Sequence, residues 1–516
     1  MNKFLSPALL LLLAVYAGTA MAADAPPAQG AAASAAAAPK EEKSVTQGSV
    51  TVEGQRVDYD ATAGTIILKN EDGKPIGSMF YVAYTKRGAN PANRPVTFFY
   101  NGGPGSSTVW LHMGAFGPHR VVTADHTHTP AAPYGMVNND YSLLDVTDEV
   151  FIDAMGTGYS RIIGKDQGGV GEPKDFYGVD ADVASFAQFI SHYLSENGRW
   201  NSPKYLFGES YGTPRSAALS NYLAQRDDID LNGVILLSSI LDFRTASFNA
   251  GNDLPFELFL PSYTAVAWYH HKLPNQPADL QPLLQQVQQF ALGDYAHALD
   301  AGNTLTDAQF DAIAEKLHDY TGLSAAYIEK ANLRVSASQF EHQLMNDDDI
   351  TVGRLDARFT GPTMDPLSEV ADYDPQSAAI SSAYVAAFND YAHNTLKFGR
   401  DQPYLPEAFH KWDWTHRNET VGQTWPGTLN TAVDLVAAMK YNPDLQVLVN
   451  SGYFDLATPY FATDYTMDHL PLPKDLQSHI HMKYYDSGHM VYAHVPALEK
   501  LHDNAAAFIK GTDNLQ

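Results

Sequence analysis

The sequence predicts an α/β fold in which a mostly parallel central sheet is flanked by helices. Between residues 182 and 241, an amphipathic helical segment, a short apolar strand, a tight turn, a second helical segment and a second apolar strand follow one another. Parallel sheets are built from this alternation. The 516 residues, 45% of them hydrophobic and 18% charged, have the composition of a globular chain that can bury a large core.

The N-terminus has the pattern of a secretory signal peptide. A single lysine precedes the apolar run ALLLLLAVYAG, and Ala20-Met21-Ala22 fits the small-x-small rule for cleavage. The run is too short to span a bilayer comfortably, so we expect cleavage after Ala22 rather than an integral membrane anchor. Residues 1–22 therefore predict export, to the periplasm or out of the cell.

Residues 23–45 are rich in alanine and proline and show no periodic apolar face. We expect a flexible spacer here. From Val50 onward the composition changes, because the segments VDYDATAGTIIL, GSMFYVAYTK and RPVTFFY are rich in β-branched and aromatic residues and are separated by turn signals. They predict an antiparallel meander, and the later segment DEVFIDA predicts one more short strand.

The helical segment DVASFAQFISHYL begins the alternation of helices and strands. Its apolar residues share one face at helical spacing, namely Val183, Phe186, Phe189, Ile190, Tyr193 and Leu194. The strand KYLF, the turn GESYG, the helical segment TPRSAALSNYLAQR and the strand GVILLSSIL follow. Ser210, in the turn, therefore lies at the carboxyl end of a parallel strand, where such sheets bind their ligands.

The pattern Gly-x-Ser-x-Gly, after a strand and before a helix, predicts that Ser210 is an enzyme nucleophile. Gly208 and Gly212 relieve crowding in a sharp turn that leaves the hydroxyl exposed. A serine hydroxyl needs a histidine base and an acid that orients the histidine. The strand LQVLVNSGYFD ends at Asp455 and a later strand ends near His489, so the three groups follow the chain order of α/β hydrolases.

The composition excludes several kinds of partner. The formal net charge of -26 and the lack of basic patches argue against nucleic acid and anionic membrane surfaces. The chain contains no cysteine, which excludes disulfides and a lipid-modified cysteine. The histidines of Asp125–His128 and His270–His271 could be metal ligands, but such histidines in a loop without a strong strand pattern are usually solvated. The acidic run Asn346–Asp349 lacks the glycine and the distal glutamate of a calcium loop, so we expect neither a metal nor a cofactor.

Five motifs together resemble the ordered landmarks of the serine carboxypeptidase family, namely NGGPGSS at 101–107, GTGYS at 156–160, GESYG at 208–212, SGYFD at 451–455 and GHMV at 488–491. This resemblance implies an α/β-hydrolase fold with an inserted, mainly helical cap, and an enzyme that removes C-terminal residues from peptides. It implies a body formed by residues 46–243 and 429–516 and a cap formed by residues 244–428.

The resemblance also implies roles for individual residues. Ser210 would be the nucleophile, Asp455 the acid and His489 the base. The backbone N–H groups of Gly103 and Tyr211 would form the oxyanion hole. The residue after the nucleophile begins a helix, where amides are unpaired, and this supports the role of Tyr211 independently.

For the free carboxylate of a peptide, the resemblance implies a clamp made by Asn101, the N–H of Gly102 and Glu209. Burial would raise the pKa of Glu209, so that its neutral form donates a hydrogen bond to the carboxylate. Met490, next to the base, matches a residue that lines the pocket for the leaving group.

Two positions depart from the family pattern. The second acid of the family's pair falls at Ala115, which removes a like charge that would raise the pKa of Glu209, and we expect activity to persist nearer to neutral pH. The family's cysteine after NGGPG is Ser106 here, so the loop loses a covalent anchor.

Together these features predict an exported serine-type carboxypeptidase that acts on peptides through an acyl-enzyme. An esterase or acyltransferase with the same three residues is an alternative, and it would need no carboxylate clamp. A non-catalytic binding protein of the same fold is a second alternative, which the complete set of Ser210, Asp455 and His489 disfavours. No motif indicates an oligomeric state or a preferred side chain at the cleavage site.

Overall fold

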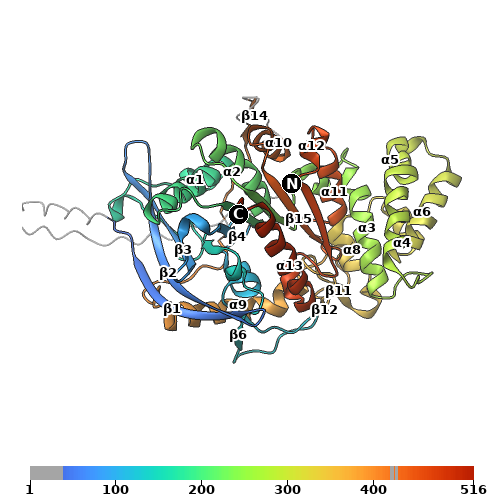
Figure 1. Ribbon diagram of the computed structural model, residues 1–516. Coiled ribbons are helices and arrows are strands. Elements are labelled where there is room, and N and C mark those ends of the chain that lie inside the picture. The colour runs from blue at the N-terminus through green and yellow to red at the C-terminus, as the bar shows by residue number, and fades with distance from the viewer. Residues whose placement is uncertain (1–38, 409, 419–422, 425–427, 516) are drawn as a thin grey trace, which may run out of the picture.

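The structure is a computed structural model that describes residues 39–408, 410–418, 423–424 and 428–515. Its centre is a mixed sheet of ten strands (Figure 1). Nine of them are neighbours in the order β1 (Lys43–Val52), β2 (Gln55–Lys69), β3 (Pro75–Lys86), β7 (Asp148–Ile152), β4 (Val96–Tyr100), β9 (Lys204–Glu209), β10 (Gly233–Leu237), β15 (Gln446–Gly452) and β16 (Ile480–Tyr485). The short strand β8 (Arg161–Ile162) pairs with β3.

The strands from β7 to β16 are parallel to one another. Each pairs in parallel with its neighbours in the sheet. β1, β2 and β3 form an antiparallel meander at one edge, and β3 joins the parallel part through β7. The predicted α/β class with a mostly parallel sheet is therefore confirmed, and the segment DEVFIDA supplies β7 as predicted.

The predicted antiparallel meander includes one strand that does not belong to it, β4, and omits one that does, β1. The segment RPVTFFY forms β4, which lies between β7 and β9 in the parallel part and does not continue the meander. All five residues of β4 are buried, as in strands that are covered on both faces. The first strand of the meander is β1, which begins at Lys43, within the residues 23–45 expected to form a spacer.

Most of the N-terminal predictions concern residues that the structure does not describe. The predicted signal peptide and residues 23–38 lie outside the described part of the chain. Among the residues that are described, no helix combines the length and the apolar character needed to cross a membrane.

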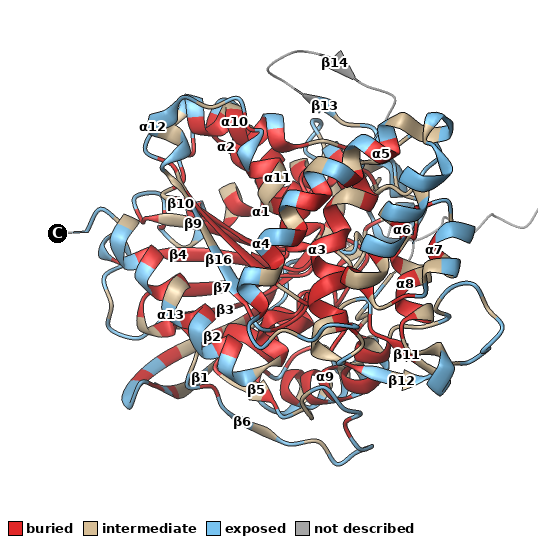
Figure 2. Cartoon of the chain, turned by 90° about the vertical axis from the view of Figure 1, so that its right-hand side faces the viewer, coloured by how far each residue is buried: buried red, intermediate tan, exposed pale blue. Residues whose placement is uncertain are grey.

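Helices cover both faces of the sheet. α1 (Val179–Glu196), α2 (Gly212–Arg226) and α10 (Ala432–Tyr441) share an apolar core with one face. α9 (Pro375–Asn394) and α13 (Val495–Thr512) share a second core with the other face. Figure 2 shows the buried residues concentrated in the strands and on the helix surfaces turned towards them. The six stripe residues predicted for α1 are all buried, which confirms this helix.

The segment between β10 and β15 is mainly helical. Six of its helices, which have a separate core, are α3 (Leu254–Tyr269), α4 (Leu280–Phe290), α5 (Ala296–Ala301), α6 (Asp307–Thr321), α7 (Ala325–Lys330) and α8 (Ala337–Gln343). α3, α4, α5 and α6 gather at one end of the molecule, beyond β15 and α11 (Tyr460–Asp468) (Figure 1). The helices α3 to α9 lie within residues 244–428, and the exact division into body and cap stays a prediction.

The remaining short elements lie outside the central layers. They are the strand pairs β5 (His119–Val121) with β6 (Met136–Asn138), β11 (Ile350–Val352) with β12 (Thr360–Pro362) and β13 (Arg417–Asn418) with β14 (Gln423–Thr424), and the helix α12 (Lys474–Gln477).

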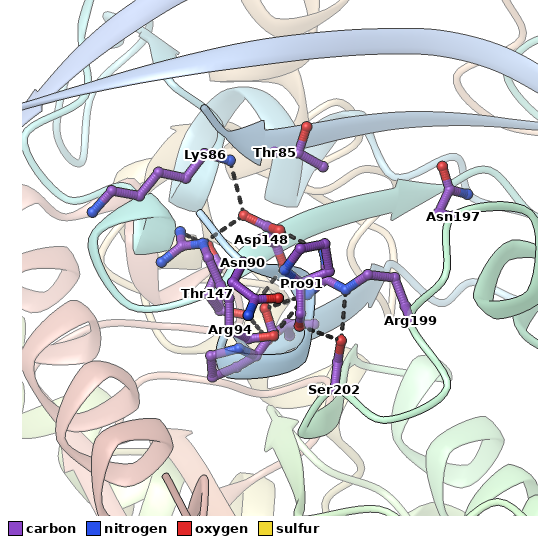
Figure 3. A network of polar contacts seen from close by, with 12 residues as sticks. Thr85, Lys86, Asn90, Pro91, Arg94, Thr147, Asp148, Asn197, Arg199 and Ser202 are labelled. Carbon is purple, nitrogen blue, oxygen red and sulfur yellow. Dashed lines mark hydrogen bonds and ion pairs between the residues drawn. The ribbon is translucent and has the colours of Figure 1, made fainter. Parts of the chain in front are cut away.

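At the amino ends of three central strands, Asp148 holds two arginines in a buried network (Figure 3). Its Oδ1 lies 2.6 Å from Nε of Arg94, and its Oδ2 lies 2.6 Å from Nη1 of Arg199. Arg199 also donates to Oγ of Ser202 and to the carbonyl oxygen of Arg94. Arg94 precedes β4, Asp148 begins β7 and Arg199 precedes β9. The network therefore connects the amino ends of these three strands, opposite to the carboxyl ends at which Ser210 lies.

Candidate active site

Ser210 lies in a tight turn between β9 and α2. Its φ of 59° is in the left-handed region, which residues with a side chain rarely adopt. Its N–H donates to the carbonyl oxygen of Leu237, the last residue of β10, at 3.0 Å. A Cβ at Gly208 would lie 2.2 Å from the carbonyl oxygen of Gly212, so only glycine fits where α2 approaches β9. This is the turn geometry expected of a nucleophile, and it leaves Ser210 partly exposed.

Asp455 and His489 form a buried pair on the loops that follow β15 and β16. Nδ1 of His489 lies 2.8 Å from Oδ2 of Asp455. Asp455 also accepts hydrogen bonds from the N–H groups of Ala457 and Thr458 and from the Thr458 hydroxyl, at 2.8, 2.9 and 2.8 Å. With Nδ1 donating to the carboxylate, Nε2 of the imidazole is left with the lone pair that a general base needs.

Backbone contacts fix the position of His489. Its N–H donates to the carbonyl oxygen of Leu355 at 2.6 Å, and its own carbonyl oxygen accepts from the Ser238 hydroxyl at 2.6 Å. Burial disfavours the imidazolium, but the charge and hydrogen bond of Asp455 and the charge of Glu209 outweigh it and raise the pKa of His489 above its usual value. The imidazole is therefore a stronger base than a free histidine.

The loop after β4, residues 101–107 and here called the glycine loop, lies directly against the turn of Ser210. A Cβ at Gly102 would lie 2.3 Å from the backbone nitrogen of Tyr211, and Gly103 has a φ of 104°. The N–H groups of Gly103 and Tyr211 donate to no other group in the described residues. Two unpaired amides beside a serine hydroxyl are the arrangement that stabilises an oxyanion.

Hydrogen bonds to a distant segment hold the far side of this loop. The N–H of Ser107 donates to the carbonyl oxygen of Pro406 at 2.9 Å, and the N–H of Ala408 donates to that of Gly105 at 2.7 Å. Nε1 of Trp110 donates to the hydroxyl of Ser106 at 2.8 Å. These contacts replace the covalent anchor that Ser106 cannot provide.

Asn101, at the start of the glycine loop, and Glu209, just before Ser210, are buried polar residues. Oδ1 of Asn101 accepts from the N–H of Leu111 at 3.0 Å, which directs the Nδ2 donor of the amide. Burial raises the pKa of Glu209 to about 7, against the lowering influence of His489, Tyr492 and Asn101. Oε2 of Glu209 is buried and has no hydrogen-bond partner among the described residues, so it can bind an incoming group.

A cavity of about 160 Å³, here called the Ser210 cavity, brings most of the predicted site together. Seven of the nine predicted site residues line it, namely Asn101, Gly102, Gly103, Glu209, Ser210, His489 and Met490. The other two, Asp455 and Tyr211, contact this set through His489 and Gly102. A larger cavity of about 880 Å³ lies at the amino ends of β10, β15 and β16 and contains none of the nine.

Sequence reasoning missed several residues that position the site. The hydroxyl of Thr458 contacts both Asp455 and His489. The buried Arg215 of α2 donates from Nη1 to the carbonyl oxygen of Asn101 at 2.8 Å and pairs with Asp182 of α1. The spacing of three between Asp455 and Thr458 is a turn pattern that could have indicated the contact between these two side chains. Nothing in the sequence links Asp182 with Arg215.

Two clusters in the described residues could offer three metal ligands, Glu41 with His192 and Glu196, and Glu53 with His502 and Asp503. None of these residues lines the Ser210 cavity.

A model of the family described as serine carboxypeptidase matches residues 54–502 of the chain. Among curated proteins, a serine carboxypeptidase-like 12 from Arabidopsis thaliana is 27% identical over 175 residues, 32% of this chain and 37% of that protein. Serine carboxypeptidase S10 family member 1 from Dictyostelium discoideum is 25% identical over 172 residues, with the same shares. Each match thus spans little more than a third of the relative's own length.

Among solved structures, that of Kex1(Δ)p, a prohormone-processing carboxypeptidase from Saccharomyces cerevisiae, has a similar fold. The TM-score is 0.53 at 16% sequence identity, over 88% of this chain and 91% of that one. This likeness and the order of the strands confirm the α/β-hydrolase fold expected from the sequence.

Proposed function

Because the chain belongs to the serine carboxypeptidase family, we propose that it hydrolyses the last peptide bond of peptides through an acyl-enzyme. One observation carries this proposal. A single cavity is lined by Ser210, by His489 in its hydrogen bond with Asp455, and by two groups suited to a terminal carboxylate, Asn101 and Glu209.

In the proposed reaction, Oγ of Ser210 attacks the carbonyl carbon of the last peptide bond, and Nε2 of His489 takes its proton. The N–H groups of Gly103 and Tyr211 donate to the oxyanion that forms. His489 then gives the proton to the leaving amine as the C–N bond breaks. Water attacks the resulting ester with His489 again as base, which releases the shortened peptide and restores Ser210.

The proposed clamp explains why a free C-terminus would be required. The amide of Asn101 and the N–H of Gly102 donate to the substrate carboxylate, and protonated Glu209 donates a third hydrogen bond. With its pKa raised to about 7, Glu209 keeps this proton in weakly acidic solution. Met490, which lines the same cavity, would contact the side chain of the departing residue.

The test compares an N-blocked dipeptide with its C-terminal amide, using protein that lacks residues 1–22 and the variant Ser210→Ala. We expect amino acid release from the free acid, little from the amide and none from the variant. Equal turnover of both substrates, or turnover of simple esters alone, would contradict a carboxypeptidase and support an esterase or acyltransferase. Failure of a fluorophosphonate to label Ser210 would contradict nucleophilic catalysis altogether.

We also propose export of the protein, with peptides outside the cytoplasm as its substrates. The support is the sequence pattern of residues 1–22. Mass spectrometry of the mature protein from cell fractions tests this, and we expect an N-terminus at Ala23 in the periplasm or the medium. A chain that keeps Met1 in the cytoplasm would contradict it.

A further inference from the structure

Among the described residues that line the Ser210 cavity, Arg354 is the sole lysine or arginine. It follows β11, and the next residue, Leu355, accepts the backbone hydrogen bond of His489. The N–H of Arg354 donates to Oδ1 of Asp374, at 2.9 Å, and Asp374 caps α9 through the N–H of Ser377. The backbone of Arg354 is therefore fixed between the turn of His489 and the start of α9.

Arg354 is exposed, and its guanidinium forms no hydrogen bond or ion pair with any residue that the structure describes. Two acids, Glu341 and Asp374, lie close to Arg354. Burial raises the pKa of Glu341 to about 8, although the positive charge of Arg354 lowers it, so this carboxyl is mostly neutral below that pH. The Asp374 carboxylate is already engaged by backbone N–H groups and the hydroxyl of Ser377.

An arginine that lines a cavity, and whose guanidinium has no hydrogen-bond or ion-pair partner, is suited to bind a carboxylate through paired N–H bonds. The terminal carboxylate of a substrate already has Asn101, Gly102 and Glu209. A second carboxylate in the same cavity would have to come from a side chain of the peptide.

The position of Arg354 indicates which side chain this is. The segment of Arg354 packs against the turn of His489, since a Cβ at Gly488 would lie 2.4 Å from Cβ of Asp356. The same turn carries Met490, which also lines the cavity. Because His489 protonates the departing amine, this wall borders the residue that is released.

We propose that Arg354 selects peptides whose last residue, the one released, is glutamate or aspartate. This inference rests on the proposed carboxypeptidase function and specifies its substrates. Glu407 is the other exposed charged residue that lines the cavity. Its backbone forms an isolated β-bridge with Ser106, on the side of the glycine loop.

The experiment measures kcat/KM for three blocked dipeptides that differ only in the last residue, which is Glu, Gln or Lys. We expect the wild type to favour Glu over Gln by about tenfold or more, the factor of a charge-assisted hydrogen bond. Arg354→Gln should bring this ratio close to one, Arg354→Lys should keep part of it, and Arg354→Glu should favour Lys. Arg56→Gln, which removes an exposed arginine of β2, is the matched control and should leave the ratio unchanged.

Two outcomes would overturn the selection by Arg354. One is a ratio that Arg354→Gln leaves unchanged. The other is an equal loss for the Glu and Gln dipeptides in Arg354→Gln, which would assign the guanidinium to the terminal carboxylate.

Titration calorimetry separates this inference from the proposed function. The inactive variant Ser210→Ala should bind the Glu dipeptide about tenfold more tightly than the Gln dipeptide. Equal affinities would contradict the role of Arg354 even if the wild type hydrolyses both. Absence of hydrolysis by the wild type with unequal affinities would contradict the proposed reaction and leave the selection by Arg354 supported.

Discussion

Nε of Arg215 lies 2.6 Å from Oδ2 of Asp182, and both side chains are almost completely buried. The pair joins α1 to α2, the helix that follows Ser210. The guanidinium also lies 4.4 Å from the ring centre of Phe186 and donates to the carbonyl oxygen of Asn101. One buried cation therefore connects the helix after the nucleophile with the loop that carries the proposed clamp.

Asp182→Asn should destabilise the protein by about 3–5 kcal/mol, because it leaves the charge of Arg215 buried without a counter-ion. Urea denaturation followed by circular dichroism measures this loss. Asp58→Asn, which breaks the exposed pair of Arg56 and Asp58, should change the free energy of unfolding by less than about 0.5 kcal/mol. Similar values for the two variants would contradict a stabilising role of the buried pair.

Glu209→Gln should change the pH dependence of hydrolysis. The pKa of Glu209 is raised to about 7, so in the wild type the clamp loses its donor proton as the pH rises through that value. The pKa of His489 is raised above its usual value, so activity also falls as the pH decreases and the base becomes protonated. We expect a bell-shaped profile of kcat/KM with its maximum near neutral pH.

A glutamine donates at every pH, so Glu209→Gln should remove the alkaline limb and keep the acidic one. Simple ester substrates, which have no carboxylate to clamp, provide the control and should lack the alkaline limb in the wild type. A sharp optimum well below neutral pH would contradict this assignment and the effect expected from Ala115.

Asp455→Asn should lower kcat by about 10⁴-fold with little effect on KM, because the imidazole loses the group that fixes its tautomer. Steady-state kinetics on a blocked dipeptide measures both constants. Thr458→Val removes the hydroxyl that contacts Asp455 and His489 and should cost about tenfold, whereas Thr458→Ser should keep the activity. Equal effects of Asp455→Asn and Thr458→Val would contradict the role of the carboxylate.

Gly102→Ala should lower kcat by about 10²–10³-fold, the cost of losing an oxyanion donor. The added Cβ would lie 2.3 Å from the nitrogen of Tyr211 and would force the two amide-bearing segments apart. Gly135 has no atom within 4 Å of such a Cβ, so Gly135→Ala is the matched control and should keep full activity. Wild-type kcat in Gly102→Ala would place the oxyanion elsewhere.

The candidate site could be predicted because each of its main residues directly follows a strand and carries a local motif. Ser210, Asp455 and His489 are 34 or more residues apart, yet parallel strands bring their carboxyl ends to one edge of the sheet. No comparable rule connects Asp182 with Arg215, because helix packing selects their contact from many equivalent ones. The expected antiparallel pairing of β4 is wrong for a related reason, since its apolar run is compatible with parallel and with antiparallel pairing.

The glycine loop is held by the hydrogen bonds of Ser107 with Pro406 and of Ala408 with Gly105, in a chain without cysteine. Its geometry therefore does not depend on thiol oxidation. The protein can mature without oxidoreductases or disulfide isomerases, and reducing agents should leave the folded enzyme intact. The same property makes the reducing cytosol of an expression host a suitable place to produce it.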